Sequence, residues 1–121
     1  MDLASCTEEL SRELKSSSDR GLETEEFVLK FLIQKKFKLV EQRYKTPFGE
    51  VDLLLDSPKN HLVMIEVKSL SSWDRLLHRL SVKQRQRLHR SRQFLENKYR
   101  RLVVLKVAYV GPKNEIVFLD T

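Results

Sequence analysis

The stretch Gly49-Glu-Val-Asp-Leu-Leu-Leu-Asp56, which a Ser-Pro-Lys-Asn turn joins to His61-Leu-Val-Met-Ile-Glu-Val-Lys68, decides the fold of this chain. Both runs are rich in Val, Leu and Ile and are bounded by turn residues, Gly49 among them, which predicts strands over Glu50–Asp56 and His61–Lys68 that pair through the turn. Side chains two apart along a strand point to the same face. We therefore expect Asp52 on the charged face of the first strand, near Glu66 and Lys68 on the charged face of the second.

The apolar residues of the two strands should follow the same alternation. We expect shared faces for Val51, Leu53 and Leu55 and for Val63, Ile65 and Val67, with Leu54 and Met64 on the charged side. The flanking patterns predict a helix from Ser18 or Asp19 to about Lys36, a strand over Lys38–Lys45, a helix over Arg75–Lys98, and strands over Leu102–Val110 and Glu115–Leu119. This order predicts a single α/β domain over residues 19–121, with a mixed central sheet and flanking helices, after a flexible lead-in over residues 1–18.

Composition narrows the class of protein. The chain has 121 residues, a mean hydropathy of −0.44 and no apolar run near the roughly 20 residues that a membrane-spanning helix needs. Its start has neither the basic nor the apolar segment of a secretory signal. A single cysteine, Cys6, leaves no internal disulfide and no cysteine-based metal site. We expect a reduced, cytoplasmic protein with no membrane partner.

The positive charge is concentrated in one segment. The chain has a net charge of +6 and a pI near 9.6. Residues 75–101 contain ten Lys or Arg and one acid, Glu96. We expect one flank of the predicted helix to carry Lys83, Arg87 and Arg90, and the other Arg85, His89 and Arg92. Such a segment favours an anionic partner and suits a nucleic-acid backbone, although basic helices are also common as plain solvated surfaces.

The pair of acids with a lysine indicates a chemistry. A charge on an apolar strand is costly unless it is paired or bound to an ion. Two adjacent carboxylates, Asp52 and Glu66, repel each other and suit a divalent cation such as Mg²⁺ or Mn²⁺, and Lys68 can hold a water or a phosphate oxygen. This set meets the needs of metal-assisted phosphodiester hydrolysis. The alternative is a cross-strand Glu–Lys pair on a solvated edge.

Two further polar residues interrupt apolar rows. Glu25 falls in the middle of the stripe that the first helix presents to the core, which we expect to consist of Leu22, Val28, Leu29, Leu32 and Ile33. Its carboxylate either joins the site or reaches solvent past the helix rim. Gln84 lies in the inward row of the basic helix. It either hydrogen-bonds the site lysine or a phosphate, or caps backbone groups.

Four blocks of sequence resemble a known family. They are Gly21 with Glu25 and Phe31-Leu32, then Gly49-Glu-Val-Asp-Leu-Leu, then Val63-Met-Ile-Glu-Val-Lys-Ser69, then Val82-Lys-Gln-Arg-Gln-Arg-Leu88. Their spacing over residues 20–110 is similar to that of the YraN family of small bacterial nuclease-like proteins. The resemblance implies a restriction-endonuclease-like αβββαβ core, a minimal version of the PD-(D/E)xK endonuclease fold related to archaeal Holliday-junction resolvases.

The resemblance also implies roles for individual residues. Asp52 and Glu66 would be metal ligands with the carbonyl of Val67, and Lys68 would position the attacking water or stabilise the phosphorane-like charge. Glu25 would bind a metal-bound water or a second ion. Gln84 and Lys83 would contact the substrate phosphate or complete the site, and Glu50 belongs to the motif without an assigned role. This chain departs from the family pattern at Arg43, usually Asn, at Val28, usually small, and at Ser69-Leu70, usually Thr-Arg.

The leading hypothesis is therefore a Mg²⁺- or Mn²⁺-dependent endonuclease that acts on DNA, including branched or recombination intermediates. Symmetric cutting of a junction needs two sites, which suggests a homodimer. The alternative is a non-catalytic nucleic-acid-binding module that assists a helicase or repair partner. A third reading is an interaction domain whose basic helix docks on an acidic protein.

Overall fold

The elements of the chain follow the expected order. The structure is a computed structural model and describes residues 17–121. Its elements are helix α2 (Ser17–Gln34), strands β1 (Lys38–Thr46), β2 (Gly49–Asp56) and β3 (Leu62–Ser69), the 3₁₀ helix η1 (Trp73–His78), helix α3 (Val82–Tyr99), and strands β4 (Val103–Val110) and β5 (Ile116–Asp120). The expected lead-in over residues 1–18 lies almost wholly outside the described residues, as does Cys6. The prediction of a mixed α/β fold is confirmed.

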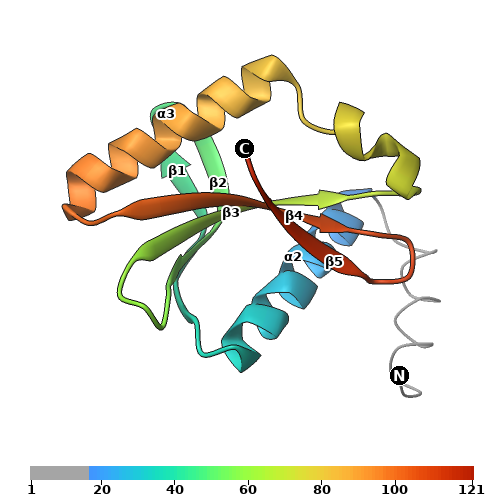
Figure 1. Ribbon diagram of the computed structural model, residues 1–121, viewed down its shortest axis with the longest axis horizontal. Coiled ribbons are helices and arrows are strands. Elements are labelled where there is room, and N and C mark those ends of the chain that lie inside the picture. The colour runs from blue at the N-terminus through green and yellow to red at the C-terminus, as the bar shows by residue number, and fades with distance from the viewer. Residues whose placement is uncertain (1–16) are drawn as a thin grey trace.

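The five strands form one sheet in the order β1-β2-β3-β4-β5. Only β3 and β4 run parallel, and the other neighbours are antiparallel hairpin partners. A parallel pair needs a long crossover, which η1 and α3 supply between β3 and β4. Figure 1 shows α3 over one face of the sheet and α2 over the other, so the sheet is the middle of three layers.

Each face of the sheet buries its own apolar cluster. The cluster on the α3 side includes Leu54, Met64, Leu88, Leu95 and Val107. The cluster on the α2 side includes Val28, Leu32, Leu53, Leu55 and Ile65. Full burial of such side chains contributes about 1.5–3 kcal/mol each relative to exposure. The two clusters hold both helices against the strands, and through them the residues at the edge of each cluster.

The expected alternation along β2 is wrong at Val51. Leu53 and Leu55 share a face as predicted, and that face meets α2, but Val51 packs with Leu54 in the cluster on the α3 side. The cause lies in the neighbouring strands. Pairing with β3 ends at Leu53, and on the β1 side Arg43 has a φ of 51°, which breaks the regular pleat.

The long basic helix predicted over Arg75–Lys98 is wrong in its first third. The chain instead forms η1, and α3 begins only at Val82. Ser81 is the cause, because its hydroxyl accepts from the backbone N–H of Gln84, and the Gln84 side chain accepts from the backbone N–H of Ser81. This reciprocal capping box satisfies two amide groups at a helix start and so favours a new helix there.

The stripe predicted for the first helix is too wide. Val28, Leu29 and Leu32 are buried, whereas Leu22 and Ile33 are 42% and 49% exposed. At about 100° per residue these two lie roughly 60° and 80° around the helix from Glu25. The stripe that meets the sheet is therefore centred near Glu25, and Leu22 and Ile33 fall at its rim. Among residues 17–121, no helix combines the length and the apolar character needed to cross a bilayer.

Trp73 fixes the crossover to the sheet. Its ring packs against the cluster on the α3 side and lies directly over Gly111, and its Nε1 donates to Glu115 Oε2 at 3.0 Å. A Cβ atom on Gly111 would lie 2.6 Å from the Trp73 ring. Gly111 is thus the position that admits the indole.

Gly111→Ala should therefore destabilise the protein, because the indole must move away from its packed position. We expect the free energy of unfolding to fall by about 1–3 kcal/mol, as for overpacked cores. Urea denaturation followed by the fluorescence of the single tryptophan measures this. The matched control is Gly21→Ala in α2, where an added Cβ meets nothing within 4 Å and should be neutral or stabilising. Equal effects of the two substitutions would contradict the packing argument.

Candidate functional site

The site forms where β2 and β3 separate. Their backbone pairing ends at Leu53 opposite Ile65, so Asp52 and Glu66 are the first residues beyond it. The gap is bridged by a side chain, because Asp52 Oδ2 accepts a hydrogen bond of 2.8 Å from the backbone N–H of Val67. The two acids thus face each other at the mouth of the gap instead of continuing the ladder.

A cavity of about 360 Å³ opens at this gap. Its lining includes five residues proposed from the sequence, which are Glu25, Asp52, Glu66, Val67 and Lys68. The remaining lining residues are Gly21, Thr24, Ser69 and Arg79. The structure therefore brings α2 and the diverging ends of β2 and β3 to one place, although Glu25 is 27 positions from Asp52 in the sequence.

Glu66 and Lys68 form a buried ion pair rather than a solvated edge pair. Lys68 Nζ lies 3.3 Å from Glu66 Oε2, and the two side chains are 12% and 8% exposed. Burial and, second, the negative charge of Asp52 together raise the pKa of Glu66 to about 7, against the lowering effect of Lys68. A carboxyl group with this pKa exchanges its proton near neutrality.

Glu25 enters the cavity from α2 with one oxygen unsatisfied. Its Oε2 lies 3.4 Å from Arg43 Nη2, while its Oε1 is buried and has no hydrogen-bond partner. Burial and, second, the charge of Asp52 raise the pKa of Glu25 to about 7, against the lowering effect of Arg43. A buried polar atom without a partner is unusual in native proteins and marks a place where a water or an ion would be favourable. The carboxylate does not escape to solvent past the helix rim.

The donor set is compatible with a divalent cation of the Mg²⁺ type. Among residues 17–121, no group of three or more His, Cys, Asp or Glu side chains is arranged to hold a metal ion. Mg²⁺ does not require one, because it usually binds through one or two carboxylates and keeps several waters. Asp52 and Glu66 supply two carboxylates, and Glu25 Oε1 supplies an acceptor for a further ligand.

Several residues predicted for the site lie outside the cavity. Gln84 does not line it, and its side chain accepts from the Ser81 N–H, so of the alternatives left open the backbone cap is the one observed. Glu50 is exposed, and its charge adds to the rise in the pKa of Glu25. Leu70, at the position where the family pattern has arginine, is 4% exposed and packs in the core.

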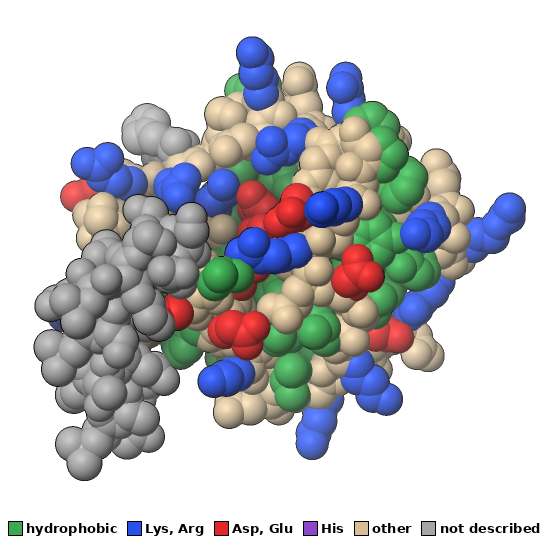
Figure 2. Space-filling view, turned by 180° about the vertical axis from the view of Figure 1, so that it is seen from behind, with side chains coloured by type: hydrophobic (Ala, Val, Ile, Leu, Met, Phe, Trp, Pro, Cys, Tyr) green, Lys and Arg blue, Asp and Glu red, His purple; other side chains and the backbone are tan. Residues whose placement is uncertain are grey.

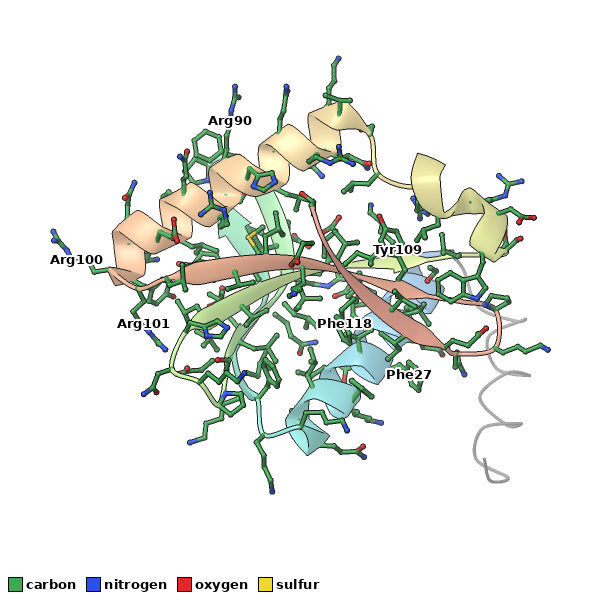
Figure 3. All side chains as sticks on the ribbon, in the orientation of Figure 1. Phe27, Arg90, Arg100, Arg101, Tyr109 and Phe118 are labelled. Carbon is green, nitrogen blue, oxygen red and sulfur yellow. The ribbon has the colours of Figure 1, made fainter. Side chains whose placement is uncertain are left out.

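The basic side chains of α3 form a surface next to the site, not a part of it. Lys83, Arg85, Arg87 and Arg90 are exposed, and Figure 3 shows Arg90 pointing away from the sheet. Arg87 lies against Gly49 at the start of β2, three residues before Asp52. Figure 2 shows, on the face turned away in Figure 1, acidic side chains gathered among Lys and Arg side chains.

Arg92 has a structural partner. Its Nη1 lies 2.7 Å from Glu96 Oε1, and Glu96 Oε2 accepts from the backbone N–H of Val103. The pair thus connects the last turns of α3 to the start of β4. This contact makes Arg92 less available to a nucleic acid than the exposed arginines of the same helix.

Two residues of the site were not proposed from the sequence. Arg43 was noted only as a departure from the family pattern, yet it is the ion-pair partner of Glu25. Arg79 was one of ten basic residues in its segment, yet it lines the cavity, and its Nε donates to the backbone carbonyl of Ser69 at 3.2 Å. No local pattern distinguishes Arg79 from its neighbours, because its place depends on how η1 ends.

Fold and site together define a small mixed α/β protein with three acids, a lysine and two arginines at a gap in its sheet. The chain belongs to the uncharacterised protein family UPF0102, whose family model matches residues 24–110. The family model thus confirms the resemblance to the YraN family as a matter of family membership.

Relatives with the family name occur in distant bacteria. A UPF0102 protein of Thermotoga petrophila is 35% identical over 78 residues, which are 63% of this chain and 71% of that protein. A UPF0102 protein of Rhodopseudomonas palustris is 32% identical over 68 residues, which are 56% and 50% of the two chains. These names state membership in the family and no activity.

The raised pKa values predict how stability depends on pH without metal. An unfolded glutamate has a pKa near 4.5, and Glu25 and Glu66 in the folded chain have values of about 7. Between these values the folded state binds more protons, so the free energy of unfolding falls as pH rises from about 4.5 to 7 and then levels. In EDTA, Glu25→Gln should raise it at pH 8 by about 1–3 kcal/mol and leave it nearly unchanged at pH 4.5.

The control for this measurement is Glu41→Gln, which changes an exposed glutamate on β1. It should shift the free energy of unfolding little, and equally at both pH values. Chemical denaturation at pH 4.5 and pH 8 gives all four differences. A Glu25→Gln effect that does not change with pH would show that this carboxyl is not held protonated by its surroundings.

Proposed function

We propose that this protein is a divalent-metal-dependent nuclease that hydrolyses phosphodiester bonds in DNA. The observation that carries the proposal is the gap between β2 and β3, where Asp52 bridges to Val67 and two further acids and a lysine share one cavity. A purely structural Glu–Lys pair needs neither a second carboxylate at its side nor a third from another element. Such a concentration of buried acids destabilises a fold and is typical of functional sites.

The topology supports the likeness to the PD-(D/E)xK endonucleases. Apart from η1 and the last strand β5, the described elements run helix, three antiparallel strands, helix, strand, which is the order of the αβββαβ core. The acids come from the second and third strands, as in the Asp and Glu-x-Lys positions that the sequence resemblance assigns. Fold alone does not determine function, so the proposal depends on the site.

Asp52 and Glu66 would hold the metal ion with the carbonyl of Val67. The ion, when bound, would neutralise charge that develops on the phosphate during hydrolysis. It would also offset the repulsion that raises the pKa of Glu66. We propose Mg²⁺ or Mn²⁺, because carboxylate and carbonyl oxygens suit both.

The other residues would act on the water and the phosphate. Lys68, held by Glu66, would donate a hydrogen bond from Nζ to the attacking water or to a non-bridging phosphate oxygen. Glu25 Oε1, which lacks a partner, would accept a hydrogen bond from a water in the cavity. Arg43 would keep the Glu25 carboxylate oriented through its other oxygen.

The charge distribution supports a nucleic acid as substrate. Lys83, Arg85, Arg87 and Arg90 would attract a phosphate backbone without reading base sequence. Branched DNA is a substrate that fits such sequence-independent binding. To cut both strands of a branch, the protein would act as a homodimer with two sites. A helicase or repair protein would be a fitting partner. We also propose a cytoplasmic location, because the protein would act where the DNA of the cell lies.

Metal titration and cleavage test the proposal together. Mn²⁺ is titrated into the protein by calorimetry, and duplex, single-stranded and four-way-junction DNA and a matched RNA are then incubated with it. Asp52→Asn and Glu66→Gln should each lower cleavage at least 100-fold and weaken Mn²⁺ binding, because each removes a charged ligand. Glu41→Gln, which changes a glutamate outside the cavity, should leave both unchanged.

The alternative outcomes are distinct. DNA binding without cleavage, equal in wild type and in both variants, would overturn the nuclease and favour the non-catalytic module that assists a partner. Cleavage that survives in Asp52→Asn and Glu66→Gln would place the activity elsewhere or in a contaminant. Preferential cleavage of RNA would keep the chemistry and change the substrate.

A further inference from the structure

We infer that Arg79, with Arg75, forms a phosphate-binding subsite that leads one nucleic-acid strand from the acidic cavity across η1. The inference rests on the proposed function and adds to it the path of the substrate. It adds two residues to those that the sequence predicted for backbone contacts, which are Lys83, Arg85, Arg87, Arg90 and Arg92. Three observations on η1 and its surroundings support it.

Arg79 is anchored at the mouth of the acidic cavity. Its Nε donates to the carbonyl of Ser69, the residue that follows Lys68, at 3.2 Å. A guanidinium has five N–H donors, so this bond fixes its position and leaves four donors for a ligand. Among residues 17–76 and 79–121, no carboxylate forms an ion pair with Arg79. An oriented guanidinium with free donors suits bidentate recognition of a phosphate.

Arg79 is also the wall between two cavities. On one side it lines the acidic cavity, and on the other a second cavity of about 500 Å³ lined by Ser72, Asp74, Arg75 and Arg79 itself. Among the described residues that line it, the second cavity has two arginines and one aspartate. A strand whose phosphate is cleaved beside Glu66 needs a place for the next phosphate, and this neighbouring basic cavity supplies one.

The position of η1 is fixed by packing, which makes the subsite preorganised. Trp73, in the first turn of η1, is locked over Gly111 and bonded to Glu115. At the other end Arg79 caps η1, with its backbone N–H bonded to the carbonyl of Leu76 at 3.4 Å. Preorganised donors lose little entropy on binding, so they contribute more affinity than mobile surface arginines.

Arg75 and Arg79 are exposed like most arginines of α3, but the arginines of α3 do not line the two cavities. Arg90 points away from the sheet, and none of Lys83, Arg87 and Arg90 lines either cavity. At physiological salt, electrostatic interactions between exposed charges are largely screened beyond about 8 Å. Lys83, Arg87 and Arg90 therefore act on the backbone only where it passes over α3, whereas Arg79 and Arg75 position the strand at the reacting phosphate.

The test compares arginines that differ in place and not in charge. Arg79→Gln and Arg75→Gln are compared with Arg100→Gln, which lies at the end of α3 away from η1 (Figure 3). A fluorescein-labelled single strand of 12 nucleotides is titrated with each protein in EDTA, and anisotropy gives Kd between 50 and 200 mM salt. Cleavage is absent under these conditions, so binding is measured whether or not the protein is a nuclease.

Arg79→Gln should weaken binding about tenfold and Arg75→Gln about threefold, and each should lower the salt slope by about 0.7, the value for one phosphate contact on a single strand. Arg100→Gln should change Kd less than twofold. Arg79→Lys, which keeps the charge and loses the fork, should fall between wild type and Arg79→Gln. Circular dichroism and the thermal midpoint show whether each variant is folded. If Arg79→Gln does not fold, Arg75→Gln still tests the subsite.

Equal effects of Arg79→Gln and Arg100→Gln would overturn the inference and leave only a general charge effect. If the wild-type protein nevertheless cleaves DNA, the proposed nuclease activity stands and only the proposed path of the strand is wrong. The expected losses in a protein that never cleaves would support the subsite and remove the proposed hydrolysis. The two failures are thus separable by one binding and one cleavage measurement.

Discussion

The hydrogen bond from the Val67 N–H to Asp52 Oδ2 is the contact on which the rest of the site depends. A separating pair of strands leaves backbone groups without partners, and a buried N–H without one costs about 1–3 kcal/mol. Here a carboxylate replaces the missing carbonyl. The strands can therefore diverge without that cost, and the gap between them becomes the cavity. The same bond holds the Asp52 charge beside Glu66, which raises the pKa of Glu66 and suits the pair to a cation.

The site is a destabilising feature that the two apolar clusters offset. Burial and the charge of Asp52 disfavour the ionised forms of Glu25 and Glu66, and among the described residues Arg43 and Lys68 partly offset this through their ion pairs. The clusters on the two faces of the sheet pin α2 and α3 independently. The separate anchoring of the two helices matters for the site. Glu25 reaches the cavity from α2, whereas Arg79 reaches it from the crossover between β3 and β4, which includes α3. Neither helix can shift without changing one side of the cavity.

Much of the fold and part of the site could be predicted from the sequence. Period-two and period-3.6 patterns are local, so they placed Asp52, Glu66 and Lys68 on neighbouring strands and Glu25 on the inner face of its helix. The misses come from non-local causes. Val51 changes face because pairing with β3 stops at Leu53, which no alternation within β2 records. The break before α3 was readable in principle, since Ser81 and Gln84 have the spacing of a capping box.

Arg79 shows why the remaining part of the site could not be predicted. Its segment holds ten basic residues. The sequence predicted one continuous helix for most of this segment, and on such a helix nothing distinguishes Arg79 from the other basic residues. Once the chain forms η1 and restarts at Ser81, Arg79 falls at the turn between the two and meets the end of β3. The arginine that touches the acidic cavity is therefore selected by the tertiary break and not by charge density. For a basic segment beside an acidic site, the residues that position a substrate should be sought at such breaks, where a guanidinium can be anchored by a backbone carbonyl, before they are sought on the exposed helix face.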